Sequence, residues 1–150
     1  MVISSEGSGY VLRNPDYFSY NYSASGSKSH VLEPYSTYNI APSDEGLSNS
    51  VIAQLCKVID PAKVTSGLNV TAESFYSSQG RIDDSFDDSN AEVLTTIASR
   101  YPSAKTLEME SFMLLHLAKC CRVPVHATAA GSQCYLFEFA GNQFTYDCIR

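Results

Sequence analysis

The stretch that decides the fold runs from Leu107 to Cys121 and reads LEMESFMLLHLAKCC. Wound as a helix, it is apolar around almost its whole circumference, so other parts of the chain must cover it on most sides. We therefore expect it to form the core helix of the domain. The run Val123–Ala130 follows it and is typical of a buried strand.

Towards the N-terminus, the apolar pattern predicts an alternation of strands and helices. Lys63–Val70 has the β-branched character of a strand. An apolar stripe predicts a helix over residues 43–59, with Ser43 as its N-cap. A capping box of Ser89 and Glu92 predicts the start of a second helix. The resulting β-α-β-α-β order favours an α/β layered fold.

The two ends of the chain carry shorter strand patterns. Met1–Arg13 is expected to form a pair of strands around the glycine turn Gly7–Gly9. Tyr17–Tyr38 is rich in Ser and Tyr with little periodicity, which predicts a long surface loop with at most a short strand. The tail Gln133–Ile149 alternates aromatic residues about Ala140–Asn142, and this pattern predicts a hairpin.

Length and charge exclude several classes of protein. The chain has 150 residues, of which 44% are hydrophobic, and this suits a single domain with a core. Ten Lys and Arg residues against 16 Asp and Glu give a net charge of -6, which argues against nucleic-acid binding. No stretch approaches the about 18 apolar residues of a membrane span, and the N-terminus lacks a signal-peptide pattern. We therefore expect a soluble, cytoplasmic protein without a membrane partner.

No metal site is predicted. The run from Asp83 fails the calcium-loop pattern, because its sixth and twelfth positions are Asp88 and Leu94 instead of glycine and glutamate. His116 and Cys120 have a helical spacing that suits two ligands, but no second pair converges with them, so a hydrogen-bonded core histidine is favoured. The cysteine spacings fit neither a disulfide scaffold nor zinc pairs, and reduced, mostly buried thiols are expected: Cys56, Cys120, Cys121, Cys134 and Cys148.

Two carboxylates interrupt the apolar stretch. Glu108 and Glu110 each need a hydrogen-bond donor nearby, because burying an unpaired carboxylate costs several kcal/mol. The hydroxyl groups of a ligand would supply such donors. A strand-to-helix junction, at which solvent or the helix N-terminus stabilises both groups, would meet the same need.

A second polar segment follows the strand expected at Lys63–Val70. Gln79 and Arg81 lie beyond the carboxyl end of that strand, where open α/β sheets bind ligands. An amide and a guanidinium together suit a flat ring with carbonyl and imide edges, on which Phe75 could stack. The alternative is a simple turn in which Arg81 pairs with a neighbouring aspartate, Asp83 or Asp84.

Taken together, FYSSQGR at 75–81 and LEMES at 107–111 resemble the uridine phosphorylases of the nucleoside phosphorylase family. The resemblance runs from about Met1 to Ala130. It implies part of a three-layer α/β/α sandwich with a central mixed sheet, in a protein that forms homo-oligomers. It also implies reversible phosphorolysis of uridine to uracil and ribose 1-phosphate, in pyrimidine salvage, with phosphate as co-substrate and no cofactor.

The resemblance assigns roles to both segments. It implies a base subsite of Phe75, Gln79 and Arg81, in which Arg81 counters the charge on the departing uracil. It implies a ribose subsite of three consecutive residues: Glu108, Met109 and Glu110. Glu110 would accept hydrogen bonds from the ribose hydroxyls, and Glu108 would support the pocket. Arg81 and Glu110 are thus the implied catalytic residues.

Two parts of the family pattern have no counterpart here. The family's phosphate-binding glycine loop and arginines precede the position of Met1, and Gly131–Arg150 matches no family segment. We therefore expect residues 1–130 to be a partial phosphorylase domain with the nucleoside half of the site and little turnover, and 131–150 to be an unmatched tail. A non-catalytic nucleoside-binding or regulatory protein, and a purine nucleoside phosphorylase or nucleoside hydrolase, remain as alternatives.

Overall fold

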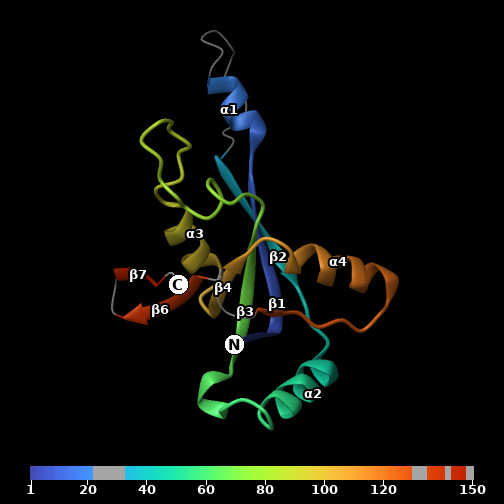
Figure 1. The fold of residues 1–150 in the computed structure, drawn as a ribbon. Helices are drawn as coiled ribbons and strands as arrows, with labels where there is room; N and C mark the ends of the chain where they lie inside the picture. The colour runs from blue at the N-terminus through green and yellow to red at the C-terminus, as the bar shows by residue number, and fades with distance from the viewer. Residues whose placement is uncertain (22–32, 130–134, 141–142, 148–150) are drawn as a thin grey trace.

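The fold is built on one mixed sheet (Figure 1), and the computed structural model describes residues 1–21, 33–129, 135–140 and 143–147. Three parallel strands form its centre: β1 (Val2–Arg13), β3 (Thr65–Ala72) and β4 (Ala104–Glu108). Four antiparallel strands extend it: β2 (Tyr35–Ala41) and β5 (Thr128–Ala129) pair with β1, and the hairpin of β6 (Tyr135–Ala140) and β7 (Gln143–Asp147) adjoins β4. The predicted α/β class and mixed sheet are confirmed, and so is the tail hairpin.

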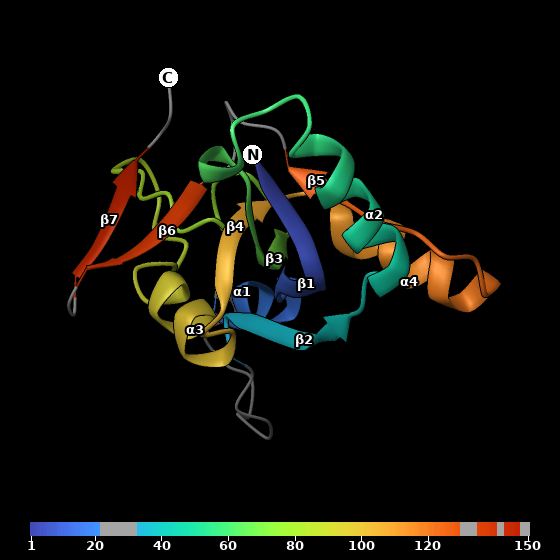
Figure 2. The ribbon, with the colours of Figure 1, turned by 90° about the horizontal axis from the view of Figure 1, so that it is seen from below.

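Helices lie on both faces of the sheet, as the view in Figure 2 shows. On one face lies α3 (Val93–Arg100), and on the other lie α2 (Glu45–Leu55) and α4 (Ser111–Cys121). Two short elements complete the set, α1 (Pro15–Asn21) after β1 and the 3-10 helix η1 (Pro61–Lys63) before β3. This is the three-layer α/β/α arrangement that the family resemblance implied.

The main core lies between the sheet and α3. Alternation along β3 turns Val70 towards α3 and the polar Asn69 and Thr71 towards the opposite face, where α4 lies. On α3, Leu94 and Ile97 are at most 4% exposed, and burying each such side chain stabilises the fold by about 2 kcal/mol. The larger cluster contains Val11, Tyr35, Leu68, Val70, Ala72, Val93, Leu94, Ile97, Tyr101, Ala104 and Leu107.

On the other face of the sheet, the prediction of a core helix over Leu107–Cys121 is wrong. The first residues of that stretch end β4, and the helix begins only at Ser111. Within α4 only Leu115 is buried, whereas three large apolar side chains are 48–61% exposed: Met113, Leu114 and Leu117. A helix that is apolar on all sides has no distinct apolar face, so the sequence could not predict which side of α4 packs against the sheet.

The N-terminal segment forms one strand instead of the predicted pair. Gly7 has φ +104°, and its pairing with β3 shifts register after Ile3, so a bulge takes the place of a turn. A Cβ atom at Gly7 would lie 2.2 Å from the carbonyl oxygen of Ala41 on β2. Only glycine permits both this backbone conformation and this close approach.

Two further segments differ from the sequence prediction. The segment Tyr17–Tyr38 contains most of α1 and the start of β2, although it was expected to be mainly a loop, and residues 22–32 lie outside the described ranges. The buried strand expected at Val123–Ala130 shrinks to β5, and Val123 is 54% exposed. Pro124 has no backbone N–H and cannot donate to a strand ladder, which accounts for the loss of strand structure at the start of this segment.

The helix caps also differ from the prediction. Asp44, not Ser43, caps α2, because its Oδ1 accepts a hydrogen bond from the backbone N–H of Leu47 at 2.8 Å. No capping box precedes α3: Ser89 has φ +50°, and Glu92 occupies the cap without a side-chain hydrogen bond. The helix predicted over residues 43–59 is α2, which begins two residues later and ends four residues earlier, and α3 begins four residues after the predicted cap Ser89.

The thiols and the histidine of α4 are more accessible than predicted. Cys120 and Cys121 are exposed and free, and Cys56 is half-buried and free. Cys134 and Cys148 lie outside the described residues. His116 is exposed, with Nε2 at 3.9 Å from the Sγ of Cys120, so the prediction of a core histidine is wrong. The reason is again that α4 leaves most of its surface uncovered.

No helix of the described residues is long and apolar enough to cross a membrane.

Candidate functional site

The first polar segment is the loop that leaves the carboxyl end of β3, drawn in yellow-green in Figure 1. Two backbone hydrogen bonds close its turn, from Gly80 N to Ser77 O at 3.1 Å and from Arg81 N to Tyr76 O at 3.0 Å. Gly80 has φ +67°, and a Cβ atom there would lie 2.6 Å from Cδ1 of Leu94 on α3. The turn is therefore packed tightly against the start of α3.

Within this turn, Gln79 carries an unmet hydrogen-bond acceptor. The residue is 6% exposed, and its Oε1 meets no donor among the residues that the structure describes. Leaving a buried acceptor unpaired costs about 1–3 kcal/mol. Such a group suits a site in which a ligand supplies the missing donor.

A cation and an aromatic ring lie beside this acceptor in the sequence. The guanidinium carbon of Arg81 lies 3.9 Å from the ring centroid of Phe75, which is 48% exposed. Tyr76 packs edge-on against the same ring, with centroids 5.3 Å apart. The guanidinium covers one face of Phe75, so a ligand ring stacked on Phe75 would use the other face.

The second segment is the junction between β4 and α4, where Glu108 is held by four hydrogen bonds. Its Oε1 accepts from Asn69 Nδ2 and from Thr71 Oγ1, both at 2.5 Å. Its Oε2 accepts from the backbone N–H groups of Glu110 and Ser111 at 2.7 and 2.8 Å. Burial alone would raise the pKa of Glu108, but these hydrogen bonds outweigh it and hold the pKa below its usual value.

The carboxylate of Glu108 thus orders the junction. Phe112 N donates to Thr71 Oγ1 at 2.8 Å, so Glu108 and Thr71 between them pair the first N–H groups of α4. This is the strand-to-helix junction that the sequence allowed as an alternative, and the donors that Glu108 required come from the protein itself.

The two residues that follow have a different setting. Met109 is 37% exposed and Glu110 is exposed. The carboxylate of Glu110 folds back to accept from the backbone N–H of Met109 at 3.2 Å. The turn therefore presents an acceptor and a backbone donor side by side, which is the pattern that a hydroxyl group can bridge.

Both segments lie at one edge of the sheet. Strands β3 and β4 are parallel neighbours, and Thr71 pairs in register with Glu108 at their carboxyl ends. Ligands of open α/β sheets bind at this edge. No group of three metal-ligating side chains occurs within the described ranges.

Comparisons with known proteins bear on this geometry. The sequence model of the phosphorylase superfamily matches residues 1–135. The chain belongs to the phosphorylase superfamily. Among solved structures, it is similar to a chain from a structural and catalytic study of two diverse uridine phosphorylases in the oomycete Phytophthora capsici, with 32% identity and a TM-score of 0.72.

That similarity covers 88% of this chain and 48% of the oomycete chain, so this superfamily member spans about half the length of the solved relative. No curated protein matches the chain. The family resemblance stated from the sequence is confirmed at the level of the superfamily. The expected roles of individual residues remain predictions.

Sequence reasoning missed the polar residues that organise this candidate site. Asn69 and Thr71 are fully buried and reach Glu108 across 39 and 37 residues of sequence. Asn90 is 6% exposed, and its amide donates to the carbonyl of Arg81 at 2.8 Å. Asparagine and threonine inside a β-branched strand are a signal that could have singled out the first two, because buried polar groups need partners.

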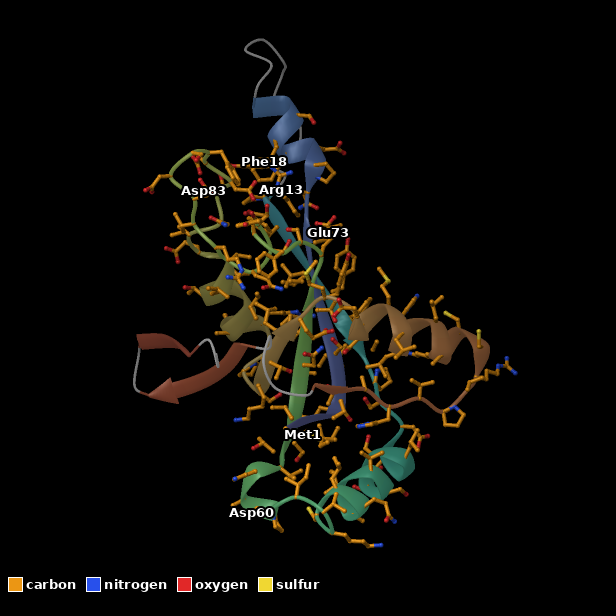
Figure 3. All side chains as sticks on the ribbon, in the orientation of Figure 1. Met1, Arg13, Phe18, Asp60, Glu73 and Asp83 are labelled. Atoms are coloured by element: carbon orange, nitrogen blue, oxygen red, sulfur yellow. The ribbon has the colours of Figure 1, made fainter. Side chains whose placement is uncertain are left out.

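An ion pair also holds the far side of the loop. Arg13 at the end of β1 donates to Asp88 Oδ1 at 2.7 Å and lies 3.5 Å from the ring centroid of Phe18 on α1. Figure 3 shows Arg13 and Phe18 at this end of the molecule, with Asp83 of the loop beside them. Burial and the neighbouring Asp88 raise the pKa of Tyr35, whose hydroxyl donates to Asp88 O at 2.8 Å. The loop is therefore tied to β1 and β2 as well as to α3.

Proposed function

We propose that this chain recognises a pyrimidine nucleoside, with uridine as the first candidate, as part of a phosphorolysis site. The observation that carries the proposal is the buried Oε1 of Gln79, which lacks a donor among the described residues. The imide N–H of uracil is a donor of the right kind. The similar oomycete chain comes from a study of uridine phosphorylases, which supports the same choice.

In this proposal the loop after β3 binds the base. Gln79 accepts from the imide N–H, and Arg81 donates to a uracil carbonyl oxygen. When the glycosidic bond breaks, its electron pair leaves with uracil, and negative charge spreads to the carbonyl oxygens. A fixed guanidinium stabilises that charge where it develops. Phe75, which already packs under Arg81, is assigned to the wall beside the base.

The turn after β4 is assigned to the ribose. A ribose hydroxyl would donate to the Glu110 carboxylate and accept from Met109 N–H, replacing the 3.2 Å contact between these two groups. Glu108 is assigned a supporting role, because its four hydrogen bonds fix the backbone that carries both groups. A phosphate oxygen would attack the anomeric carbon of a ribose held in this way.

Isothermal titration with uridine tests the proposal. We expect Gln79→Ala to weaken binding about tenfold, as for a lost neutral hydrogen bond. Arg81→Ala should weaken it by about 30-fold or more, because a charged donor is lost. Gln54→Ala and Arg100→Ala are matched controls, since these side chains bind Lys57 and Asn39 elsewhere on the surface, and both should bind uridine normally. Unchanged binding in both loop variants would contradict the proposal.

Two added arms separate the alternative functions. Inosine in place of uridine tests a purine nucleoside preference, and tighter binding of inosine would overturn the pyrimidine assignment. Release of uracil with and without phosphate distinguishes phosphorolysis from hydrolysis. Uridine binding that phosphate leaves unchanged, with no uracil released, would assign the chain to the non-catalytic nucleoside binders.

A further inference from the structure

The loop that carries Gln79 and Arg81 is fastened by one buried asparagine. The side-chain amide of Asn90 donates to the carbonyl of Arg81 at 2.8 Å and, at 3.5 Å, to the carbonyl of Tyr76. The same two residues are also bonded to each other, because the backbone N–H of Arg81 donates to the carbonyl of Tyr76 at 3.0 Å and closes the turn. Asn90 therefore binds the backbone on both sides of the turn, at Tyr76 and at Arg81.

Asn90 is itself fixed to the body of the protein. Its backbone carbonyl accepts from Val93 N at 3.1 Å, where α3 begins. Two residues earlier, Asp88 is bound by Arg13, and it is 4% exposed. Ser89 between them adopts a left-handed conformation, φ +50°, and its N–H donates to Asp87 Oδ1 at 2.8 Å. The asparagine is thus attached on both sides and can act as a rigid support.

We propose that Asn90 is a positioning residue for base recognition, which fixes the backbone of Arg81 and thereby the direction of its guanidinium, without touching the nucleoside. The inference rests on the proposed function of the loop. A rigid support matters there because Arg81 must hold one direction to donate to a carbonyl oxygen, and a hydrogen bond weakens steeply as its angle departs from linearity. Because the shorter of the two Asn90 hydrogen bonds is to the carbonyl of Arg81, a change at Asn90 should affect uridine binding through Arg81.

Uridine titration of four variants tests this coupling. We expect Asn90→Ala to weaken uridine binding about tenfold. Asn14→Ala is the matched control, because the Asn14 amide also donates twice, to Glu33 O at 2.6 Å and Ser36 Oγ at 2.8 Å, away from the loop. The double variant Asn90→Ala with Arg81→Ala should bind no more weakly than Arg81→Ala alone. Independent, additive losses would overturn a role that acts through Arg81.

Limited digestion with trypsin tests the support without any ligand. Trypsin cleaves after Arg81, and the next residue, Ile82, is 73% exposed. We expect cleavage at this bond to be at least fivefold faster in Asn90→Ala than in the unaltered chain, with no change at Lys57, whose neighbour Val58 is 80% exposed. If Asn90→Ala does not fold, Asn90→Asp, which keeps the size but loses the amide donors, takes its place.

The two measurements fail separately. If the unaltered chain does not bind uridine, the proposed function is overturned, whereas the digestion still decides whether Asn90 fastens the loop. If the unaltered chain binds uridine but Asn90→Ala is cleaved after Arg81 no faster than the unaltered chain, the role of Asn90 is overturned and the proposed function stands.

Discussion

The loop after β3 and the turn after β4 start from neighbouring strand ends, yet the buried polar groups of the two segments differ in whether the protein itself supplies their hydrogen-bond partners. In the turn, Glu108 receives four donors from its own chain. In the loop, the Oε1 of Gln79 is buried and receives none from the described residues. The difference separates a group that stabilises the fold from a group whose hydrogen bond, in the proposed function, a ligand would complete. Stability and ligand binding should therefore respond oppositely to changes in the two segments.

The largest effect is expected from Glu108→Ala. It leaves Asn69, Thr71 and two backbone N–H groups without their acceptor, and we expect a loss of about 3 kcal/mol or more in the free energy of unfolding. Urea denaturation measures this. Glu110→Ala is the matched control and should stay within about 0.5 kcal/mol, because that carboxylate is exposed. Equal effects would remove the distinction between the two acids.

Gly80→Ala should have the next largest effect. The residue has φ +67°, and the added Cβ would lie 2.6 Å from Leu94 Cδ1, so we expect a loss of about 2 kcal/mol. Gly46→Ala in α2 is the control. The nearest atom to its Cβ would lie at 3.5 Å, and the change should add about 0.5 kcal/mol of stability. A lower unfolding temperature for both variants would show that the loop is no more constrained than α2.

Gln79→Met should separate binding from stability. An apolar side chain of similar size removes the buried acceptor, so the free energy of unfolding should be unchanged or rise by up to about 1 kcal/mol. Uridine binding should weaken about tenfold or more. Gln54→Met on the surface of α2 should alter neither quantity. A clear loss of stability in Gln79→Met would mean that the amide is a structural group.

The smallest expected effect is a difference in acid sensitivity. Because the pKa of Glu108 is lowered in the folded protein, its contribution is complete above its ordinary value of 4.5 and is lost as the pH falls through the lower folded value. Glu108→Gln cannot titrate at this position. The unaltered chain should therefore lose more stability than Glu108→Gln as the pH falls below 4.5. Parallel pH profiles from urea denaturation would contradict this assignment.

The parts of the fold that the sequence predicted are those with one buried face. The strand β3 and the helix α3 have apolar residues that repeat with the period of the element and are buried, Leu68 and Val70 on β3 and Leu94 and Ile97 on α3. The apolar stripe also located α2, but within that helix only Ser48 is buried and Leu47 is 39% exposed. The strand β4 is five residues long and contains a lysine and a threonine, so no alternation identified it. The following helix α4 is apolar on all sides, so the sequence prediction joined the end of β4 and α4 into one helix.

The site shows a similar division. Glu108, Gln79 and Arg81 could be singled out because their chemistry conflicts with a plain core or turn. Their supports could not, since Asn69 reaches Glu108 from 39 residues away through strand pairing. The opposite settings of Glu108 and Glu110, two positions apart, also depend on that pairing. Side-chain chemistry is thus readable from the sequence here, whereas the partners that satisfy it come from the tertiary structure.

A two-dimensional amide NMR titration of the intact chain with uridine tests the central claim most directly. We expect uridine to shift the backbone signals of residues 75–81 and 109–111 together, with one shared dissociation constant, because both segments would contact one ligand. The signals of α2 should stay in place. Shifts confined to either segment alone, or no shift at residues 75–81, would contradict the proposal that the two segments form one nucleoside site.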